Sequence, residues 1–126
     1  MKVLIVDDER IVRLSLKRAL ASRGHEVVEA CDGGEGLARW KEQKFDVIFL
    51  DVLMPVLSGP QVLVKRGDFD EKVILMSAYS GDYDIDRARE IGADLFMAKP
   101  FSDIFSVVQG AEKLVGVDFE SYFRKI

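Results

Sequence analysis

The chain has 126 residues, of which 48% are hydrophobic and 32% charged, so it is long enough for one globular domain and too short for two. A net charge of −4 without a basic block disfavours nucleic acid and anionic membranes as partners. The one cysteine, Cys31, excludes an internal disulfide, and the one histidine, His25, excludes a poly-histidine metal site. No apolar run approaches the roughly 20 residues of a membrane span, and the N-terminus lacks a signal peptide pattern. We therefore expect a cytoplasmic protein whose chemistry depends on carboxylates, hydroxyls and lysines.

Strands and helices are predicted to alternate along the chain. The apolar run Val3–Val6 predicts a strand buried on both faces, and an amphipathic helix follows it and ends near Gly24. Further strands are expected at 25–30, 45–50, 73–76 and 95–98. Further helices are expected at 35–43, 61–66, 83–91 and 103–115, separated by loops with glycine and proline.

Five strand–helix pairs predict an α/β fold, with one five-stranded parallel sheet and helices on both faces. This unit covers residues 1–116 as a single domain. Residues 117–126 follow it with a short apolar stripe at helical spacing, formed by Phe119, Tyr122, Phe123 and Ile126. We interpret this stretch as a short C-terminal amphipathic helix that docks on the domain or begins a linker, in preference to a dimer seam.

Polar residues follow four of the predicted strands at the point where each ends. Asp7 and Asp8 follow the first strand, Asp51 the third, Ser77 the fourth and Lys99 the fifth. Because the carboxyl ends of parallel strands share one edge of a sheet, these side chains are expected to meet in one pocket.

Three carboxylates in one pocket repel each other, so a divalent cation is expected among them. Mg²⁺ fits best, because proteins hold it with one or two carboxylates, waters and a phosphate. The remaining carboxylate is then available as a nucleophile, and Lys99 and Ser77 suit the oxygens of a phosphoryl group. The predicted chemistry is metal-assisted phosphoryl transfer to an aspartate.

The same residues resemble a known family, the receiver domain of two-component response regulators of the chemotaxis type. The matching segments are Val-Asp-Asp-Glu at 6–9, Leu-Asp-Val-Leu-Met-Pro at 50–55, Ser-Gly at 58–59, Met-Ser-Ala at 76–78, Gly-Ala at 92–93 and Ala-Lys-Pro-Phe at 98–101. They lie in the family's order at the predicted strand ends. The resemblance implies a doubly wound (βα)5 flavodoxin-like fold.

The resemblance also implies a role for each matching residue. Asp51 would be the phosphoacceptor, and the metal would be bound by Asp8 directly, by Asp7 mostly through water, by Asp51 and by the backbone carbonyl of Leu53. Ser77 and Lys99 would contact the phosphoryl group. Pro100 would follow a cis peptide bond, and Phe96 stands where the family has its switch aromatic.

The implied function is a signalling switch rather than an enzyme, since such a domain catalyses only its own phosphorylation and dephosphorylation. A histidine kinase or a phosphotransfer protein would donate to Asp51, Ser77 would move inward, and Phe96 would follow. The surface formed by 83–91, 95–98 and 103–115 would then change toward a downstream partner, an output domain on a longer chain, or a second copy in a phosphorylation-dependent homodimer. Plain core packing is the alternative interpretation of Phe96.

Two bulky residues flank the predicted phosphoryl group. Leu53 and Tyr79 lie two residues after Asp51 and Ser77, where the resemblance implies control of hydrolysis. Neither side chain is acidic or an amide, so we expect them to hinder the attacking water and to give a long-lived phosphorylated form.

Three other functions are weighed against the switch. A dehalogenase-like hydrolase would need a second acid where Leu53 stands, a degenerate receiver would lack a site residue, and a flavin-binding module would not need the acids. Outside the site, Cys31 is interpreted as a small apolar filler, His25 as a turn residue and Trp40 as helix packing.

Overall fold

The computed structural model describes residues 1–78 and 85–116. The strands are β1 (Lys2–Val6), β2 (Glu26–Ala30), β3 (Val47–Asp51), β4 (Lys72–Ser77) and β5 (Leu95–Ala98). The helices are α1 (Arg10–Ser22), α2 (Gly33–Glu42), α3 (Gly59–Arg66), α4 (Ile85–Glu90) and α5 (Ile104–Val115). The predicted helix at 83–91 is therefore described only from residue 85, and the predicted tail at 117–126 lies outside the described residues.

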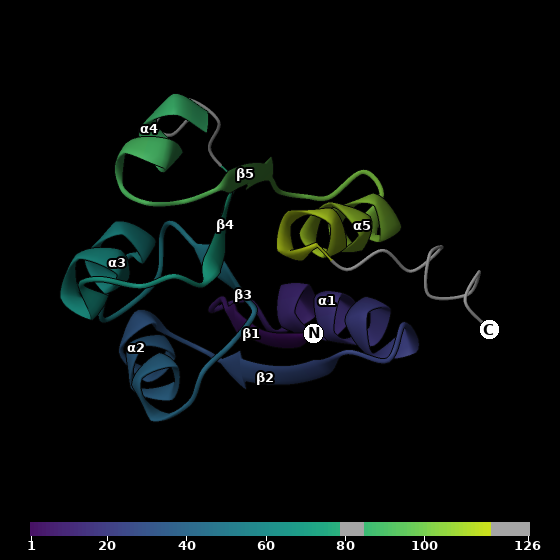
Figure 1. Cartoon of the computed structure of the whole chain (residues 1–126), viewed down its shortest axis with the longest axis horizontal. Helices are drawn as coiled ribbons and strands as arrows, with labels where there is room; N and C mark the ends of the chain where they lie inside the picture. Colours follow the sequence, from purple (N-terminus) through teal and green to yellow (C-terminus); the bar gives the residue numbers. More distant parts are fainter. Residues whose placement is uncertain (79–84, 117–126) are drawn as a thin grey trace.

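The five strands form one parallel sheet in the order β2-β1-β3-β4-β5, which confirms the predicted α/β architecture. Helices α1 and α5 cover one face, and α2, α3 and α4 cover the other (Figure 1). Alternate residues of each central strand face opposite layers, so Val3 and Ile5 pack with α1 and α5, while Leu4 and Val6 pack toward α2. Two covered faces explain why these strands are continuous apolar runs.

Two helices begin two residues earlier than predicted. Helix α2 begins at Gly33 instead of residue 35, because Asp32 caps it by accepting a hydrogen bond from the Glu35 N–H at 2.7 Å. Helix α3 begins at Gly59 instead of residue 61, after a Ser58 capping box. Glycine and proline at these starts looked like loop residues, but a proline fits the first turn of a helix, where its missing N–H costs nothing.

Gly59 lets α3 begin directly against the end of β3. A Cβ atom added to Gly59 would lie 2.5 Å from the carbonyl oxygen of Asp51, a distance that real contacts do not allow. Any larger residue would push α3 and the loop before it away from Asp51. The glycine therefore helps to fix the backbone around the sheet edge where the acids lie.

Two buried polar contacts lie away from that edge. Trp40 on α2 donates from Nε1 to Glu71 Oε2 at 2.8 Å, so its predicted packing role is confirmed and includes a hydrogen bond. His25 precedes β2, as expected of the turn, and its Nε2 lies 2.7 Å from Glu112 Oε2 on α5. Arg23 pairs with the same carboxylate at 2.8 Å, so this cluster joins the end of α1 to α5.

Candidate functional site

The carboxyl ends of the strands bring the predicted polar residues to one edge of the sheet. Asp7 follows β1, Asp51 ends β3, Ser77 ends β4 and Lys99 follows β5. Carboxylate oxygens of Asp7, Asp8 and Asp51 lie within 4.8 Å of one another. Asp7 and Asp51 are buried and Asp8 is exposed, so the cluster opens to solvent on the Asp8 side.

Lys99 binds two of these acids at once. Its Nζ lies 3.0 Å from Asp7 Oδ2 and 3.3 Å from Asp51 Oδ2, and only 6% of its side chain is exposed. Burial lowers the pKa of Lys99, but hydrogen bonding and charge attraction from Asp7 and Asp51 outweigh burial and raise it above 10.5. Lys99 is therefore a permanent cation within this cluster.

One lysine does not balance the buried acids. Burial and the neighbouring charge of Asp7 raise the pKa of Asp51 from 3.8 to about 7, against the opposing effect of Lys99. Burial also raises the pKa of Asp7, although the Glu9 N–H and Lys99 act against it. At neutral pH the acids of this cluster therefore resist full ionisation. A nearby divalent cation would offset the repulsion between their carboxylates.

The donor set fits Mg²⁺. The three carboxylates are hard oxygen ligands that converge within 4.8 Å, and the exposed Asp8 gives a hydrated ion a way in. The carboxylates leave an excess of negative charge over Lys99, which matches the charge of a divalent cation.

Comparison with known proteins identifies the family. The model of the family described as response regulator receiver domain matches residues 3–107. The chain belongs to this family. As a receiver domain it has the function class of two-component response regulators, which is phosphorylation-dependent signalling.

The receiver domain is similar to curated regulators and to solved structures. It is 42% identical over 102 residues to the transcriptional regulatory protein PrrA of Mycobacterium tuberculosis, covering 79% of this chain and 44% of PrrA. It is 33% identical over 106 residues to the protein PilG of Pseudomonas aeruginosa, covering 81% and 78%. The chain spans about 40% of the length of the probable transcriptional regulator ycf27 of Guillardia theta, which it also matches.

Two solved structures show the same fold. A CheY-like receiver domain protein from Methanospirillum hungatei superposes with a TM-score of 0.83 at 26% identity, covering 91% of this chain and 93% of that one. A chain of the CheX-CheY-BeF3-Mg+2 complex from Borrelia burgdorferi superposes with a TM-score of 0.81 at 28% identity, covering 90% and 88%. These likenesses confirm the flavodoxin-like architecture predicted from the sequence.

The other predicted site residues fall in different places. The Lys99–Pro100 peptide bond is cis, as predicted, and Phe96 lies in β5, partly buried against the core beneath α2, α3 and α4. Leu53 lies in the loop after β3 with an exposed side chain. Tyr79, the second residue expected to control phosphoryl lifetime, lies outside the described residues.

Two residues of this receiver domain's site had no predicted role. Glu9 accepts from Lys99 Nζ at 3.1 Å with one side-chain oxygen, and its backbone N–H donates to Asp7 Oδ1 at 2.8 Å. Arg13 on α1 donates to the carbonyl oxygen of Asp7 at 2.7 Å. The acidic run at 7–9 was a signal for Glu9, whereas no local pattern indicates that Arg13 would bind a backbone oxygen six residues earlier.

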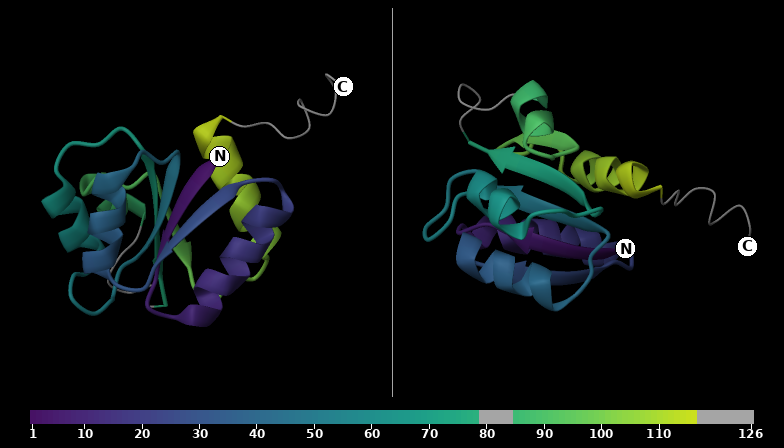
Figure 2. Two further views of the ribbon diagram at one scale, coloured as in Figure 1. Left: turned by 90° about the horizontal axis from the view of Figure 1, so that it is seen from below. Right: turned by 60° about the vertical axis from the view of Figure 1, so that its left-hand side comes forward.

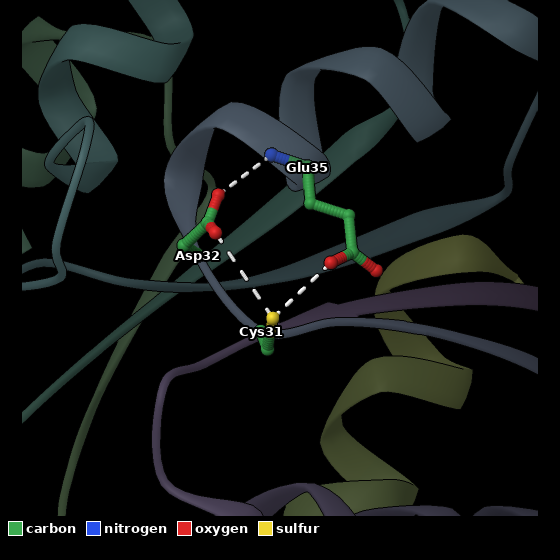
Figure 3. A group of neighbouring side chains, drawn as sticks. All are labelled: Cys31, Asp32 and Glu35. Carbon is green, nitrogen blue, oxygen red and sulfur yellow. Dashed lines mark hydrogen bonds between the residues drawn. The ribbon is translucent and has the colours of Figure 1, made fainter.

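A second group of metal-ligating side chains lies at the end of β2, where the sequence had suggested an apolar filler. Cys31 is exposed, so the interpretation as an apolar filler is wrong. Its Sγ donates to Glu35 Oε2 at 3.1 Å and lies 4.0 Å from Asp32 Oδ2 (Figure 3). The neighbouring carboxylate of Glu35 raises the pKa of the thiol, which favours the neutral form. Asp32 and Glu35 act here as a helix cap and a thiol acceptor.

Among the residues that the structure describes, none of the helices is both long enough and apolar enough to cross a membrane.

Proposed function

We propose that this receiver domain accepts a phosphoryl group on Asp51 in a Mg²⁺-dependent reaction and acts as a signalling switch. The observation that supports this proposal is the position of Asp51 at the end of a central strand. There it forms an ion pair with Lys99, and its carboxylate lies within 4.8 Å of those of Asp7 and Asp8. The donor would be a sensor histidine kinase or a phosphotransfer protein, as the family implies. Apart from this reaction and its reversal by hydrolysis, we propose no enzyme activity.

The contacts favour Asp51 over Asp7 as the phosphoacceptor. Asp7 uses both carboxylate oxygens, Oδ1 for the Glu9 N–H and Oδ2 for Lys99, and its side chain has no exposed surface. Asp51 pairs with Lys99 through Oδ2 and ends β3 at the sheet edge where the acids lie. An Asp51 oxygen would form a bond to phosphorus as the phosphorus–nitrogen bond of phosphohistidine breaks, and the released imidazole nitrogen takes up a proton.

The remaining residues would neutralise and orient the phosphoryl group. Asp7, Asp8, Asp51 and the carbonyl oxygen of Leu53 would hold Mg²⁺, which supplies positive charge to the phosphoryl oxygens. Lys99 would add an ammonium that keeps its proton, because its pKa lies above 10.5. The Ser77 hydroxyl would donate a hydrogen bond. The similar CheX-CheY complex from Borrelia burgdorferi is a complex with BeF3 and Mg+2, which supports the same chemistry here.

We propose that Ser77 and Phe96 carry the switch to the surface of α4, β5 and α5. Ser77 ends β4 and Phe96 lies on the neighbouring strand β5, where Leu75 pairs with Phe96 and Ser77 pairs with Ala98. A shift of Ser77 toward the phosphoryl group would therefore act on the strand that carries Phe96. Leu53 and Tyr79 would slow hydrolysis of the phosphoryl group. Equal dephosphorylation rates in Leu53→Asn, Tyr79→Ala and the unchanged protein would refute this role for the two residues.

Several parts of the proposal concern what lies beyond the domain. Three partners stay predictions: a downstream protein, an output domain on a longer chain, and a second copy in a phosphorylation-dependent homodimer. The cytoplasmic location and the lack of nucleic acid and membrane partners also stay predictions. So do the domain limits 1–116 and 117–126. The relatives that are named transcriptional regulators are longer than this chain, and favour an output domain.

Incubation with acetyl phosphate and Mg²⁺ tests the phosphoacceptor. We expect a mass gain of one phosphoryl group by intact-protein mass spectrometry, lost in Asp51→Asn and after chelation of Mg²⁺. Asp70→Asn is the matched control, because Asp70 is exposed and pairs with Lys44 far from the site. A gain that survives Asp51→Asn would refute the assignment of Asp51, and no gain in the unchanged protein would refute the proposed function.

A further inference from the structure

A groove runs between the two helices on one face of the sheet. Helices α1 and α5 lie side by side on that face (Figure 2), and the groove between them has a volume of about 520 Å³. Most of its lining is apolar, with Leu14 and Ala19 from α1 and Ile104 from the first turn of α5. Arg18 is the charged residue of the lining.

Two large apolar side chains border the groove at one end. Ile11 at the start of α1 is 75% exposed, and Phe105 at the start of α5 is 56% exposed. A single exposed apolar residue is ordinary on a protein surface, but two that line one apolar groove give a surface that a further apolar segment would cover.

The chain leaves the described part of the fold at the opposite end of this groove. Helix α5 ends at Val115, and Gly116 adopts the left-handed conformation with φ of 90°. The Arg23–Glu112 ion pair of 2.8 Å ties the last turn of α5 to the end of α1, next to Ser22, which also lines the groove. Gly116, the last residue described, therefore follows the end of α5 that is tied to the end of α1.

We propose that residues 117–126 occupy this groove on their own chain. Along α1 the groove extends from Ile11 to Ser22, about 16 Å at 1.5 Å per residue. With 116–118 left for the turn, a helix from Phe119 to Ile126 would cover about 12 Å of it. Four apolar residues of the segment recur at i, i+3, i+4 and i+7, so a helix would present them as one stripe: Phe119, Tyr122, Phe123 and Ile126.

The charges agree with the direction that the tether imposes. A segment that starts at Ser22 and runs toward Ile11 would bring its acidic first half past Arg18 and its basic second half toward Asp8 and Asp103. The acids of the segment are Asp118 and Glu120, and its bases are Arg124 and Lys125. Arg10, next to Ile11, carries the same sign as these bases, so the tether and not the charge pattern sets the direction.

Docking in the groove has a consequence for access to the site. Ile11 follows Asp8 by three residues, so an occupied groove would cover protein surface next to the acid cluster. This consequence rests on the proposed function, but the docking itself does not. The segment would compete with any protein partner that approaches this edge over α1 and α5.

Amide hydrogen exchange of the full chain, followed by NMR, tests the docking without phosphorylation. We expect amides of 117–126 to exchange at least about tenfold more slowly than those of an unstructured peptide. If about nine molecules in ten are docked, only the undocked tenth exchanges freely, which gives this factor. Ile11→Ser and Phe105→Ser should remove the protection. Val64→Ser is the matched control, because Val64 on α3 is 77% exposed and lies outside the groove.

Each other outcome overturns the proposal. Unprotected amides in the unchanged chain, or protection that survives both groove variants, would show that the segment does not occupy the groove. Protection that disappears on dilution would assign the groove to a second copy. Exchange of the core amides of β3 confirms that every variant is folded, so a loss of protection in the segment is not a loss of the fold.

Discussion

Lys99 Nζ lies 3.0 Å from Asp7 Oδ2 in a contact where the two side chains are 6% and 0% exposed. An ion pair so far from water is costly to break from one side, because the remaining charge stays buried without its partner. The same ammonium also lies 3.3 Å from Asp51, so it stabilises two acids on different strands. Lys99 is therefore a structural residue of the fold as well as a proposed phosphoryl contact.

Lys99→Met should destabilise the metal-free protein strongly. We expect a loss of about 3 kcal/mol in the free energy of unfolding at pH 8, measured by urea denaturation, because Asp7 and Asp51 keep their repulsion and lose their cation. Lys44→Met removes the exposed Lys44–Asp70 pair and should cost far less, because water screens that pair. Equal losses in the two variants would contradict the importance of burial.

Asp51→Asn should stabilise the metal-free protein at high pH. The pKa of Asp51 is raised to about 7, so the folded state holds its proton more tightly than the unfolded chain does, and stability falls as pH rises from 3.8 through 7. Asparagine carries no ionisable carboxyl, so the variant does not lose stability in this way as pH rises. In urea denaturation with a chelator we expect a gain of about 1–2 kcal/mol at pH 8 and almost none at pH 4. A gain that does not depend on pH would contradict the raised pKa.

Mg²⁺ should stabilise the folded protein more at pH 8 than at pH 5. Below about 7 the Asp51 carboxyl is protonated and must lose its proton to bind a cation. At ten times the dissociation constant we expect about 1.4 kcal/mol at pH 8, seen as a rise in melting temperature. Asp8→Asn should abolish the rise, because Asp8 is a proposed ligand and is exposed, so that its loss leaves the fold intact. Asp70→Asn should keep the rise. Equal rises in both variants would refute the site.

The acid cluster was predictable because it depends on strand ends. Asp7, Asp51 and Lys99 each follow an apolar run, and a parallel sheet brings such positions to one edge whatever the helices do. Contacts that depend on how helices pack were not predictable in this way. His25 and Glu112 are 87 residues apart, and only the position of α5 against α1 brings them to 2.7 Å.

Local patterns are misleading where one residue type serves two structures. Gly59 and Pro60 are frequent in loops, yet both fit the first turn of α3 once Ser58 caps it. Cys31 was interpreted as an apolar filler because free cysteines are usually buried, but here it sits beyond the end of β2, beside two carboxylates at the start of α2. Neither outcome follows from the composition of the segment alone.

Glu71→Ala should destabilise the fold near Trp40. The indole N–H of Trp40 donates to Glu71 at 2.8 Å and is buried, so removing the acceptor leaves a donor without a partner, at a cost of about 1–3 kcal/mol. Glu71→Gln keeps an acceptor oxygen and should cost less. Trp40 is the one tryptophan of the chain, so its fluorescence follows this site directly during urea denaturation. A loss as large in glutamine as in alanine would contradict the role of the hydrogen bond.

Glu112→Gln should remove a part of the stability that depends on pH. Burial raises the pKa of Glu112, but hydrogen bonds from Arg23 and His25 outweigh it and lower the pKa below 4.5. A lowered carboxyl pKa gives stability that is fully present above 4.5 and lost as pH falls through the lower folded value. We therefore expect the variant to be less stable by about 2 kcal/mol at pH 7, with the difference shrinking in acid.

Urea denaturation of the two proteins from pH 7 down to pH 3 measures that difference. The titration of Asp51 is common to both proteins and cancels, so the remaining slope belongs to the Glu112 carboxyl, whose pKa is lowered. Glu26→Gln is the control, because Glu26 is exposed at the start of β2 and should follow the unchanged protein at every pH. Parallel curves for Glu112→Gln and the unchanged protein would mean that neither Arg23 nor His25 holds the Glu112 carboxylate in its ionised form, and that α5 is tied to α1 by packing alone.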